Sequence, residues 1–360
     1  MSAVDGELLV LGLAGPELTA AEAALFRKLQ PAGFILFSRN IVSPEQTRTL
    51  TDALRDLSKN QPLLAIDQEG GRVTRTREIA PVAPSAPALA ACGQPAATAT
   101  AGRLAGELLR LLGVNLNLAP VLDLDHHPET QNSLRGRCWG RDPQRVIDHA
   151  GQWNRSLRKR GIATCAKHFP AGGRACTDPH HELPASPATL EELLCEDVIP
   201  YTALMPELDA IMVGHVEFPN IDSAFPASLS PRIIRGFLRD QLGFDRQLVL
   251  TDDLDMAAIT LRYGRGADAK LAIAAGNDVA LICHRIETAE FAAAAIGELP
   301  QPVLADARER VERLRDKLHH PLPWSPSQWQ ETCAGLAALA AQVPESAAAT
   351  GLSNSPVAGY

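Results

Sequence analysis

The sequence predicts an α/β protein folded as a single (β/α)8 TIM-type barrel with a C-terminal helical extension. The chain has 360 residues, which suits a barrel of about 250 residues with added loops and a tail. Eight short apolar runs alternate with helical patterns. These runs lack polar alternation, which is typical of strands buried on both faces of a parallel sheet. Periodicity cannot show that a sheet closes, so a doubly wound open sheet is the alternative.

The expected strands are the apolar runs themselves. They are Leu8–Leu13, Gly33–Phe37, Leu63–Ile66, Val114–Leu118, Ile162–Ala166, Ala210–Val213, Leu248–Leu250 and Val279–Ile282.

Helices are expected after each strand, and the first two have clear start signals. Thr19 with Glu22 forms a capping-box pattern, and Ser43-Pro44-Glu45-Gln46 repeats it with proline at the first helical position. Further helical patterns cover 97–112, 143–160, 189–207, 230–241, 256–274 and 286–297.

Beyond the barrel, a charged helix is expected at 302–318 and an Ala-rich helix at 327–343, separated by a break at 323–326. We therefore expect a catalytic barrel in residues 1–320 and, in residues 321–360, a C-terminal helix with a flexible tail rich in Ala, Ser, Gly and Pro.

Composition excludes several classes of partner. The net charge is −8 and no basic run occurs, so nucleic acid is not expected to bind. The N-terminus is acidic and its apolar run is too short for a signal peptide or a membrane span. Seven scattered cysteines without a Cys-x-x-Cys pair indicate reduced thiols in a cytoplasm, with neither disulfides nor structural zinc. The sequence leaves the oligomeric state open, and a monomer is compatible with it.

The stretch from Ala166 to Pro184 gathers three histidines, an aspartate, a lysine and an arginine between glycines and prolines. Such breakers exclude regular structure, so the polar groups are expected on a loop, where enzymes often keep their chemistry. The alternative is that Lys167 and Arg174 are solvated and the histidines incidental.

Polar groups follow five of the eight expected strands, and in a barrel these strand ends share the catalytic rim. They are Asp67, the segment from Asn117 to Asp123 with Arg135 and Arg137 beyond it, Lys167 with His168, His215, and Asp252 with Asp253. Each also has a structural interpretation. An arginine such as Arg72, Arg75 or Arg137 could form surface salt bridges, Asp123 could cap a turn, and His215 could be a satisfied core histidine.

These residue types indicate acid–base chemistry at a carbon that bears a leaving group. A carboxylate such as Asp252 can act as nucleophile or base. Asp178 and His180 have the spacing of a pair in which the aspartate orients a proton-transferring imidazole. Side chains able to grip sugar hydroxyls would then be Asp67, Arg75, Arg137, Lys167 and His168.

Metal hydrolysis is the rival chemistry, with His168, Asp178, His180, His181 and His215 as possible ligands. Barrel metallohydrolases hold their ligands on rigid strand ends, whereas 178–181 lies in a loop and the first strand offers no histidine. We therefore expect no metal. We also expect no cofactor, because no phosphate-binding glycine motif stands at the first strand beyond a weak match at 12–15.

Five motifs in order resemble the family 3 glycoside hydrolases, in particular the bacterial cytoplasmic β-N-acetylglucosaminidases of peptidoglycan recycling. The five motifs are Ala65-Ile-Asp67-Gln-Glu-Gly-Gly-Arg-Val-Thr-Arg75, Asn117-Leu-Ala-Pro-Val-Leu-Asp123, Lys167-His-Phe-Pro170, Asp178-x-His180 and Leu250-Thr-Asp-Asp-Leu-Asp-Met256. With Phe37-Ser-Arg39-Asn40 included, the resemblance covers residues 8–285.

The resemblance implies a single-domain barrel that removes terminal β-1,4-linked N-acetylglucosamine from anhydro-muropeptides, with retention of configuration and without metal. It implies that Asp252 is the nucleophile, that His180 is the general acid/base and that Asp178 is its partner. By the same comparison Asp67, Arg75, Arg137, Lys167 and His168 bind the sugar. Some relatives with this dyad are thought to use phosphate as acceptor, and a sugar-binding relative without turnover is a further alternative.

The chain departs from the family pattern in the loop after Lys167-His-Phe. The family usually has Pro-Gly-His-Gly, whereas this chain has Pro170-Ala-Gly-Gly173 followed by Arg174, and Pro179 replaces the usual serine. Ala171 would disfavour a positive φ, and Pro179 restricts its own backbone and that of Asp178. The Asp178–His180 pair is intact.

Overall fold

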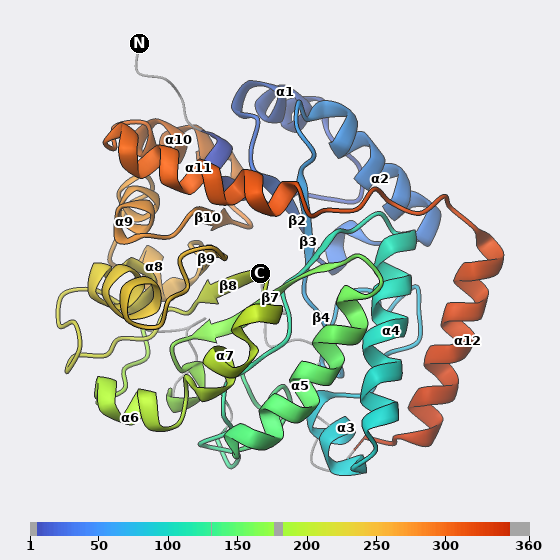
Figure 1. Cartoon of the computed structure of the whole chain (residues 1–360). Coiled ribbons are helices and arrows are strands. Elements are labelled where there is room, and N and C mark those ends of the chain that lie inside the picture. The colour runs from blue at the N-terminus through green and yellow to red at the C-terminus, as the bar shows by residue number, and fades with distance from the viewer. Residues whose placement is uncertain (1–5, 131, 176–182, 346–360) are drawn as a thin grey trace.

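A computed structural model describes residues 6–130, 132–175 and 183–345. Its centre is a closed barrel of parallel strands in the order β1-β10-β9-β8-β7-β6-β3-β2 (Figure 1). The barrel prediction is therefore confirmed, and the open doubly wound sheet is wrong. The strands are β1 Leu9–Leu11, β2 Gly33–Leu36, β3 Leu63–Ile66, β6 Leu116–Asn117, β7 Ala163–Phe169, β8 Ala210–Val213, β9 Leu248–Asp253 and β10 Val279–Ile282.

Strands β7 and β9 are longer than predicted. The sequence placed their ends where the apolar runs stop, but both strands continue into the polar residues that follow. Phe169 still pairs with Val213 of β8, and Asp253 still pairs with Leu281 of β10, each after a register shift. Backbone pairing does not depend on side-chain polarity. Lys167 and Asp252 are therefore carried on strands rather than on free loops.

Helices surround the barrel (Figure 1). They are α1 Ala20–Leu29, α2 Pro44–Leu57, α3 Ala86–Cys92, α4 Pro95–Leu111, α5 Pro143–Arg158, α6 Leu190–Cys195, α7 Ile199–Leu204, α8 Ala257–Thr260, α9 Ala267–Ala275, α10 Ala289–Ile296, α11 Gln301–Arg315 and α12 Pro326–Gln342. Both helices begin where predicted, because the Thr19–Glu22 capping box is complete and the Ser43 hydroxyl accepts from the Gln46 amide. The second capping box is only half formed, since the Gln46 side chain accepts from the Val42 amide rather than from that of Ser43.

Three helical predictions need correction. The pattern at 189–207 is divided into α6, α7 and a 3-10 turn, and that at 256–274 is divided into α8 and α9. Gly264 and Gly266 lie in the second break, and glycine favours such interruptions. The segment Arg232–Gln241 is a π-helix rather than an α-helix.

A small hairpin, β4 Gln68–Gly70 with β5 Val73–Thr74, was not predicted. Its turn uses Gly70 at φ +100° and Gly71 at φ +55°. A Cβ on Gly70 would lie 2.7 Å from the Pro84 carbonyl oxygen. The two glycines thus let the chain reverse at once after β3, and this returns Arg75 to the barrel rim.

Helix α12 lies along α4 on the outside of the barrel (Figure 1). Its apolar face is buried through residues such as Leu336 and Leu339. The Glu345 carboxylate then accepts hydrogen bonds from the Ser85 amide at 2.6 Å and the Ser85 hydroxyl at 2.7 Å, at the start of α3. Among the described helices, none combines the length and the apolar character needed to cross a membrane.

Candidate active site

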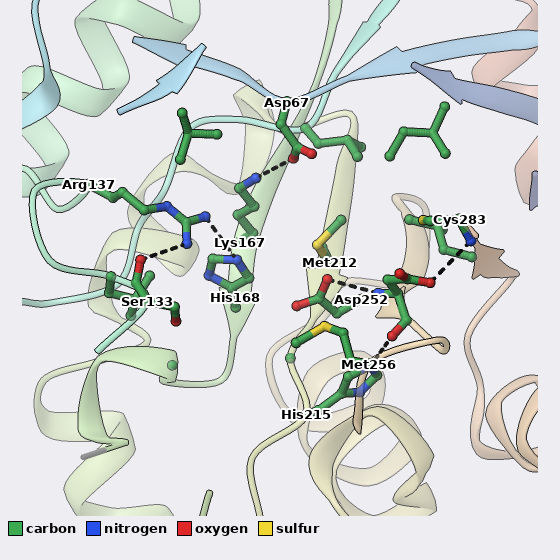
Figure 2. Close-up of a pocket in the computed structure, with 18 of the residues that line it drawn as sticks. Asp67, Ser133, Arg137, Lys167, His168, Met212, His215, Asp252, Met256 and Cys283 are labelled. Atoms are coloured by element: carbon green, nitrogen blue, oxygen red, sulfur yellow. Dashed lines mark hydrogen bonds and ion pairs between the residues drawn. The ribbon is translucent and has the colours of Figure 1, made fainter. Parts of the chain in front are cut away.

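A cavity opens at the carboxyl ends of the strands (Figure 2). Its lining includes six of the eight residues that the sequence singled out for the site, namely Asp67, Arg75, Arg137, Lys167, His168 and Asp252. The other two, Asp178 and His180, lie outside the described residues, as does His181. Strands β3, β7 and β9 thus bring together side chains up to 185 positions apart in the chain, from 67 to 252.

The centre of one wall is the Asp67 carboxylate at the end of β3. It accepts from Lys167 Nζ at 2.7 Å and from Arg75 Nη2 at 2.9 Å. Burial alone would raise the pKa of Asp67, but the charges of Lys167 and Arg75 outweigh it and hold that pKa well below its usual range. Asp67 is therefore a fixed anion, and the idea that Lys167 is solvated is wrong, since its side chain is 2% exposed.

Glu69 lies behind this wall rather than in the cavity lining, and the sequence-based site did not include it. Its carboxylate accepts two hydrogen bonds from Arg137, at 2.8 and 2.9 Å, and lies 2.6 Å from Lys167 Nζ. Burial opposes ionisation, but Arg137 and Lys167 together lower the pKa of Glu69 to about 2. The sequence shows Glu69 in the motif beside Asp67, but it does not predict the hairpin that turns this side chain toward Arg137.

His168 is oriented by Asp123, which lies at the end of the β6 loop. The Asp123 carboxylate accepts from the His168 ring Nδ1 at 2.7 Å, from the His168 amide at 2.9 Å and from the Gly173 amide at 3.2 Å. Because Nδ1 carries the proton toward the carboxylate, Nε2 can accept from Arg137, 3.4 Å away. Asp123 thus caps backbone amides, as one interpretation expected, and also orients a site residue.

The opposite wall is formed by the end of β9. The half-buried Asp252 carboxylate accepts from the Asp253 amide at 2.8 Å. Asp253 Oδ1 accepts from the amides of Asp255 at 3.0 Å and Cys283 at 3.2 Å. Burial and the neighbouring charge of Asp255 raise the pKa of Asp253 to about 7.

His215 supports this wall from below, as Figure 2 shows. The side chain is 1% exposed, and its Nε2 donates to the Asp253 carbonyl at 2.9 Å while Nδ1 lies 2.7 Å from the Ser228 hydroxyl. A carbonyl only accepts, so the proton is on Nε2. The alternative of a satisfied buried histidine is therefore confirmed, and this histidine also holds the strand end that carries Asp252.

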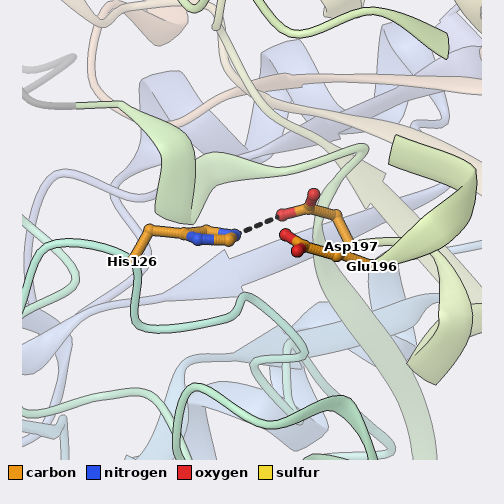
Figure 3. A group of neighbouring side chains, drawn as sticks. All are labelled: His126, Glu196 and Asp197. Atoms are coloured by element: carbon orange, nitrogen blue, oxygen red, sulfur yellow. Dashed lines mark hydrogen bonds and ion pairs between the residues drawn. The ribbon is translucent and has the colours of Figure 1, made fainter. Parts of the chain in front are cut away.

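The loop after β7 is held by Arg174, the residue that follows the unusual Ala-Gly-Gly sequence. Arg174 Nε donates to Asp197 at 2.6 Å and Nη2 donates to Glu196 at 2.9 Å. His126 Nε2 lies 2.9 Å from the same Asp197 carboxylate (Figure 3). Arg174 is therefore paired rather than solvated. Ala171 has φ −167°, an extended conformation open to any residue, so alanine causes no strain here.

His126, Glu196 and Asp197 have the atom types and spacing to hold a metal ion. The Arg174 guanidinium already lies against both carboxylates, and a cation would have to displace it. This group is better explained as a network that joins the β7 loop to the segment between α6 and α7. Of the histidines considered as ligands, His168 and His215 are engaged by the other partners named above.

A closed parallel barrel with adjacent carboxylates on one side of its rim and a paired set of cations and acids on the other is an arrangement that a glycoside hydrolase can use. Residues 4–314 match the model of the glycosyl hydrolase family 3 N-terminal domain. The chain belongs to this family and is a glycoside hydrolase, as its sequence motifs predicted.

Relatives and solved structures agree with this assignment. The chain is 36% identical over 312 residues to a β-hexosaminidase of Pseudomonas aeruginosa, covering 86% of this chain and 91% of that protein. It is also 36% identical to a β-hexosaminidase of Methylococcus capsulatus, covering 84% and 92%. The crystal structure of native NagZ from Neisseria gonorrhoeae superposes with a TM-score of 0.80 at 28% identity, covering 94% of this chain and 99% of that one. A family 3 β-N-acetylglucosaminidase from Paenibacillus gives a TM-score of 0.86 at 30% identity, covering 94% and 68%.

Proposed function

We propose that this glycoside hydrolase is a retaining exo-β-N-acetylglucosaminidase that removes terminal β-1,4-linked N-acetylglucosamine from (anhydro)muropeptides. Asp252 would be the nucleophile, His180 the general acid/base and Asp178 its partner. The observation that carries the proposal is that Asp252 shares one cavity with the network of Asp67, Lys167, Arg75 and Arg137. The similarity to a β-N-acetylglucosaminidase from Paenibacillus supports the choice of sugar.

The reaction takes place in two displacements. In the first, the Asp252 carboxylate attacks the anomeric carbon while His180 gives its proton to the departing glycosidic oxygen, leaving a glycosyl ester on Asp252. In the second, His180 takes a proton from water, the water oxygen bonds to the anomeric carbon, and the ester bond to Asp252 breaks. Configuration is retained because the carbon is inverted twice.

The charged wall is suited to hold the sugar still during both steps. Asp67, a fixed anion, can accept from two neighbouring hydroxyls, while Arg75 and Lys167 present donors beside it and His168 Nε2 offers an acceptor. These groups are positioned by each other before substrate arrives, so little reorganisation is needed on binding. Arg137, held by Glu69, would extend this set of donors.

An acidic aglycone is supported by arginines near the cavity margin. Arg72, at the hairpin turn, donates to the Arg135 carbonyl at 3.0 Å, close to the cavity-lining Ser133 and Leu134. Guanidinium groups attract the carboxylates of a peptide-bearing aglycone. Such a substrate would place the enzyme in peptidoglycan recycling in the cytoplasm, which stays an expectation from the sequence.

The test is turnover of an aryl β-N-acetylglucosaminide compared with the matching glucoside, with and without phosphate. We expect hydrolysis of the first and at most weak hydrolysis of the second, and no sugar 1-phosphate. Formation of sugar 1-phosphate would instead assign a phosphorylase of the same family. Binding without turnover would assign a non-catalytic relative, and loss of activity with a chelator would contradict a reaction without metal or cofactor.

A further inference from the structure

His284, two residues after the end of β10, lies in the cavity wall and has no role in the mechanism above. Its ring packs against Phe37, with centroids 5.2 Å apart, and its Nδ1 lies 3.2 Å from Arg39 Nη1. An arginine only donates, so Nδ1 accepts and the proton of the neutral ring is on Nε2.

Arg39 is well placed to fix this tautomer because two hydrogen bonds and a cation–π contact hold it. Its Nε donates to the Leu13 carbonyl at 2.8 Å and its Nη2 to the Cys283 carbonyl at 2.6 Å, while the guanidinium lies over the Phe37 ring at 4.6 Å. The ends of β1, β2 and β10 are thereby tied together on one side of His284.

The other side of the ring faces the nucleophile strand. His284 Nε2 lies 3.4 Å from Asp253 Oδ2, and the amides of Asp255 and Cys283 hold Oδ1. Asp253 in turn donates its amide to Asp252 at 2.8 Å. A chain of contacts therefore leads from Arg39 through His284 and Asp253 to Asp252.

We propose that Arg39, His284 and Asp253 form a positioning relay for the nucleophile, in which the Nε2–H of His284 stabilises a second carboxylate beside Asp252. This inference rests on the proposed role of Asp252. The second negative charge would stabilise the cationic, oxocarbenium-like transition state at the anomeric carbon. His284 and Asp253 would be positioning residues rather than groups that bond to the sugar.

The charges around Asp253 make this relay sensitive to pH near neutrality. Burial and the charges of Asp255 and Asp252 oppose the ionisation of Asp253, whose pKa is raised to about 7. Burial and Arg39 lower the pKa of His284 to about 4, so the ring is neutral when Asp253 ionises. The charged or titratable groups that face these two residues are Asp252, Asp255, Cys283, Arg39 and Arg75, and Asp255 is itself paired with Arg265 and Arg285.

The experiment is the pH profile of kcat/KM for an aryl β-N-acetylglucosaminide with a good leaving group, which needs little acid assistance. The unchanged enzyme should show activity rising as pH increases through about 7. His284→Ala should move this rise upward by up to about one pH unit, because the 3.4 Å contact that favours ionised Asp253 is lost. His284→Gln, which keeps an N–H donor at similar reach, should restore most of the original profile, and Asp253→Asn should abolish the rise.

The control is His149→Ala, because this histidine is also partly buried, against Trp139, but lies on α5 outside the cavity lining. Its profile should match that of the unchanged enzyme. If His284→Ala lowers kcat/KM by one factor at every pH, or if Asp253→Asn keeps the rise, the relay is wrong and His284 is only a packing residue.

A second readout separates this inference from the proposed function. Carbon NMR of labelled aspartates, with Asp253→Asn to assign the signal, follows ionisation of Asp253 without any substrate. We expect its midpoint near pH 7 in the unchanged enzyme and a higher midpoint in His284→Ala. An unmoved midpoint overturns the relay even if turnover is normal. Retained turnover in Asp252→Ala overturns the proposed function even if the midpoint moves.

Discussion

The two walls of the cavity differ in how their charges are balanced. The wall from β3, the hairpin and β7 sets Lys167, Arg75 and Arg137 against the carboxylates of Asp67 and Glu69. The wall from β9 sets two adjacent carboxylates, Asp252 and Asp253, beside a neutral imidazole. Both are largely removed from water, where an unpaired charge is costly.

Under the proposed mechanism, this contrast separates the residues that bind the sugar from those that carry out the reaction. A wall in which every buried charge has an oppositely charged partner holds one geometry, because removing any member would leave its partners less compensated. A wall with excess negative charge is costly to the fold, but it can stabilise a positive charge that appears only in the transition state. Repulsion between the carboxylates at the end of β9 is thus a cost to stability that catalysis at that wall would require.

The largest effect is expected at the acid-rich wall. Asp252→Ala should lower kcat for an aryl β-N-acetylglucosaminide by at least about a thousandfold, because no glycosyl ester can form. The exposed Glu290→Gln, which loses only a surface pair with Lys28, is the control and should keep its activity. Substantial turnover by Asp252→Ala would show that the β9 wall does not carry out the reaction.

Proton transfer can be assigned by comparing two leaving groups. His180→Ala should lower turnover of a poor leaving group by roughly 10²- to 10⁴-fold and that of an activated aryl group much less, since only the former needs protonation. Asp253, with a pKa of about 7, is the rival donor in the cavity wall. A selective loss on poor leaving groups in Asp253→Asn, with equal losses in His180→Ala, would transfer the acid role to Asp253.

The balanced wall should respond mainly in stability. Lys167→Met would leave Asp67 and Glu69 buried with less compensation, so the free energy of unfolding should fall by about 3–5 kcal/mol. Denaturant titration measures this change. Lys270→Met is the matched control because its pair with Glu298 is exposed, and it should cost no more than about 1 kcal/mol. Equal effects of the two variants would show that the wall is not a coupled network.

The smallest effects should appear in the pH dependence of stability, where the two walls should contribute with opposite signs. Glu69 has a pKa of about 2, below its ordinary value of 4.5, so its contribution is present above about pH 4.5 and is lost as pH falls toward 2. Asp253 has a raised pKa, so stability should instead decline as pH rises from about 4 to about 7. The lowered pKa of His284 opposes that decline between about pH 4 and 6.5.

Thermal unfolding at a series of pH values separates these contributions. Glu69→Gln should flatten the acid limb between about pH 2 and 4.5, and Asp253→Asn should make stability rise more with pH between about 4 and 7 than in the unchanged enzyme. If both substitutions change the curve in the same pH range and with the same sign, the electrostatic difference between the walls is not real.

Local patterns predicted most of the barrel. Apolar runs marked all eight barrel strands, and three of them, β3, β8 and β10, have the predicted bounds. These runs succeeded because a strand buried on both faces must be apolar along its length. They failed at β7 and β9, where cavity-facing polar residues continue the backbone ladder. The motifs likewise identified six residues that the structure brings together around one cavity.

What the sequence by itself determined is the list of chemical groups and the strand ends that carry them, because apolar periodicity and motif order are local properties of the chain. Only the tertiary structure decided which charges neutralise each other. Glu69 joined the site because a two-glycine turn aims it at Arg137 and Lys167, and His284 did so because β10 closes the barrel beside β9. Pairing energy depends on distance and on exclusion of water, and both are set by closure of the barrel rather than by any local stretch of residues.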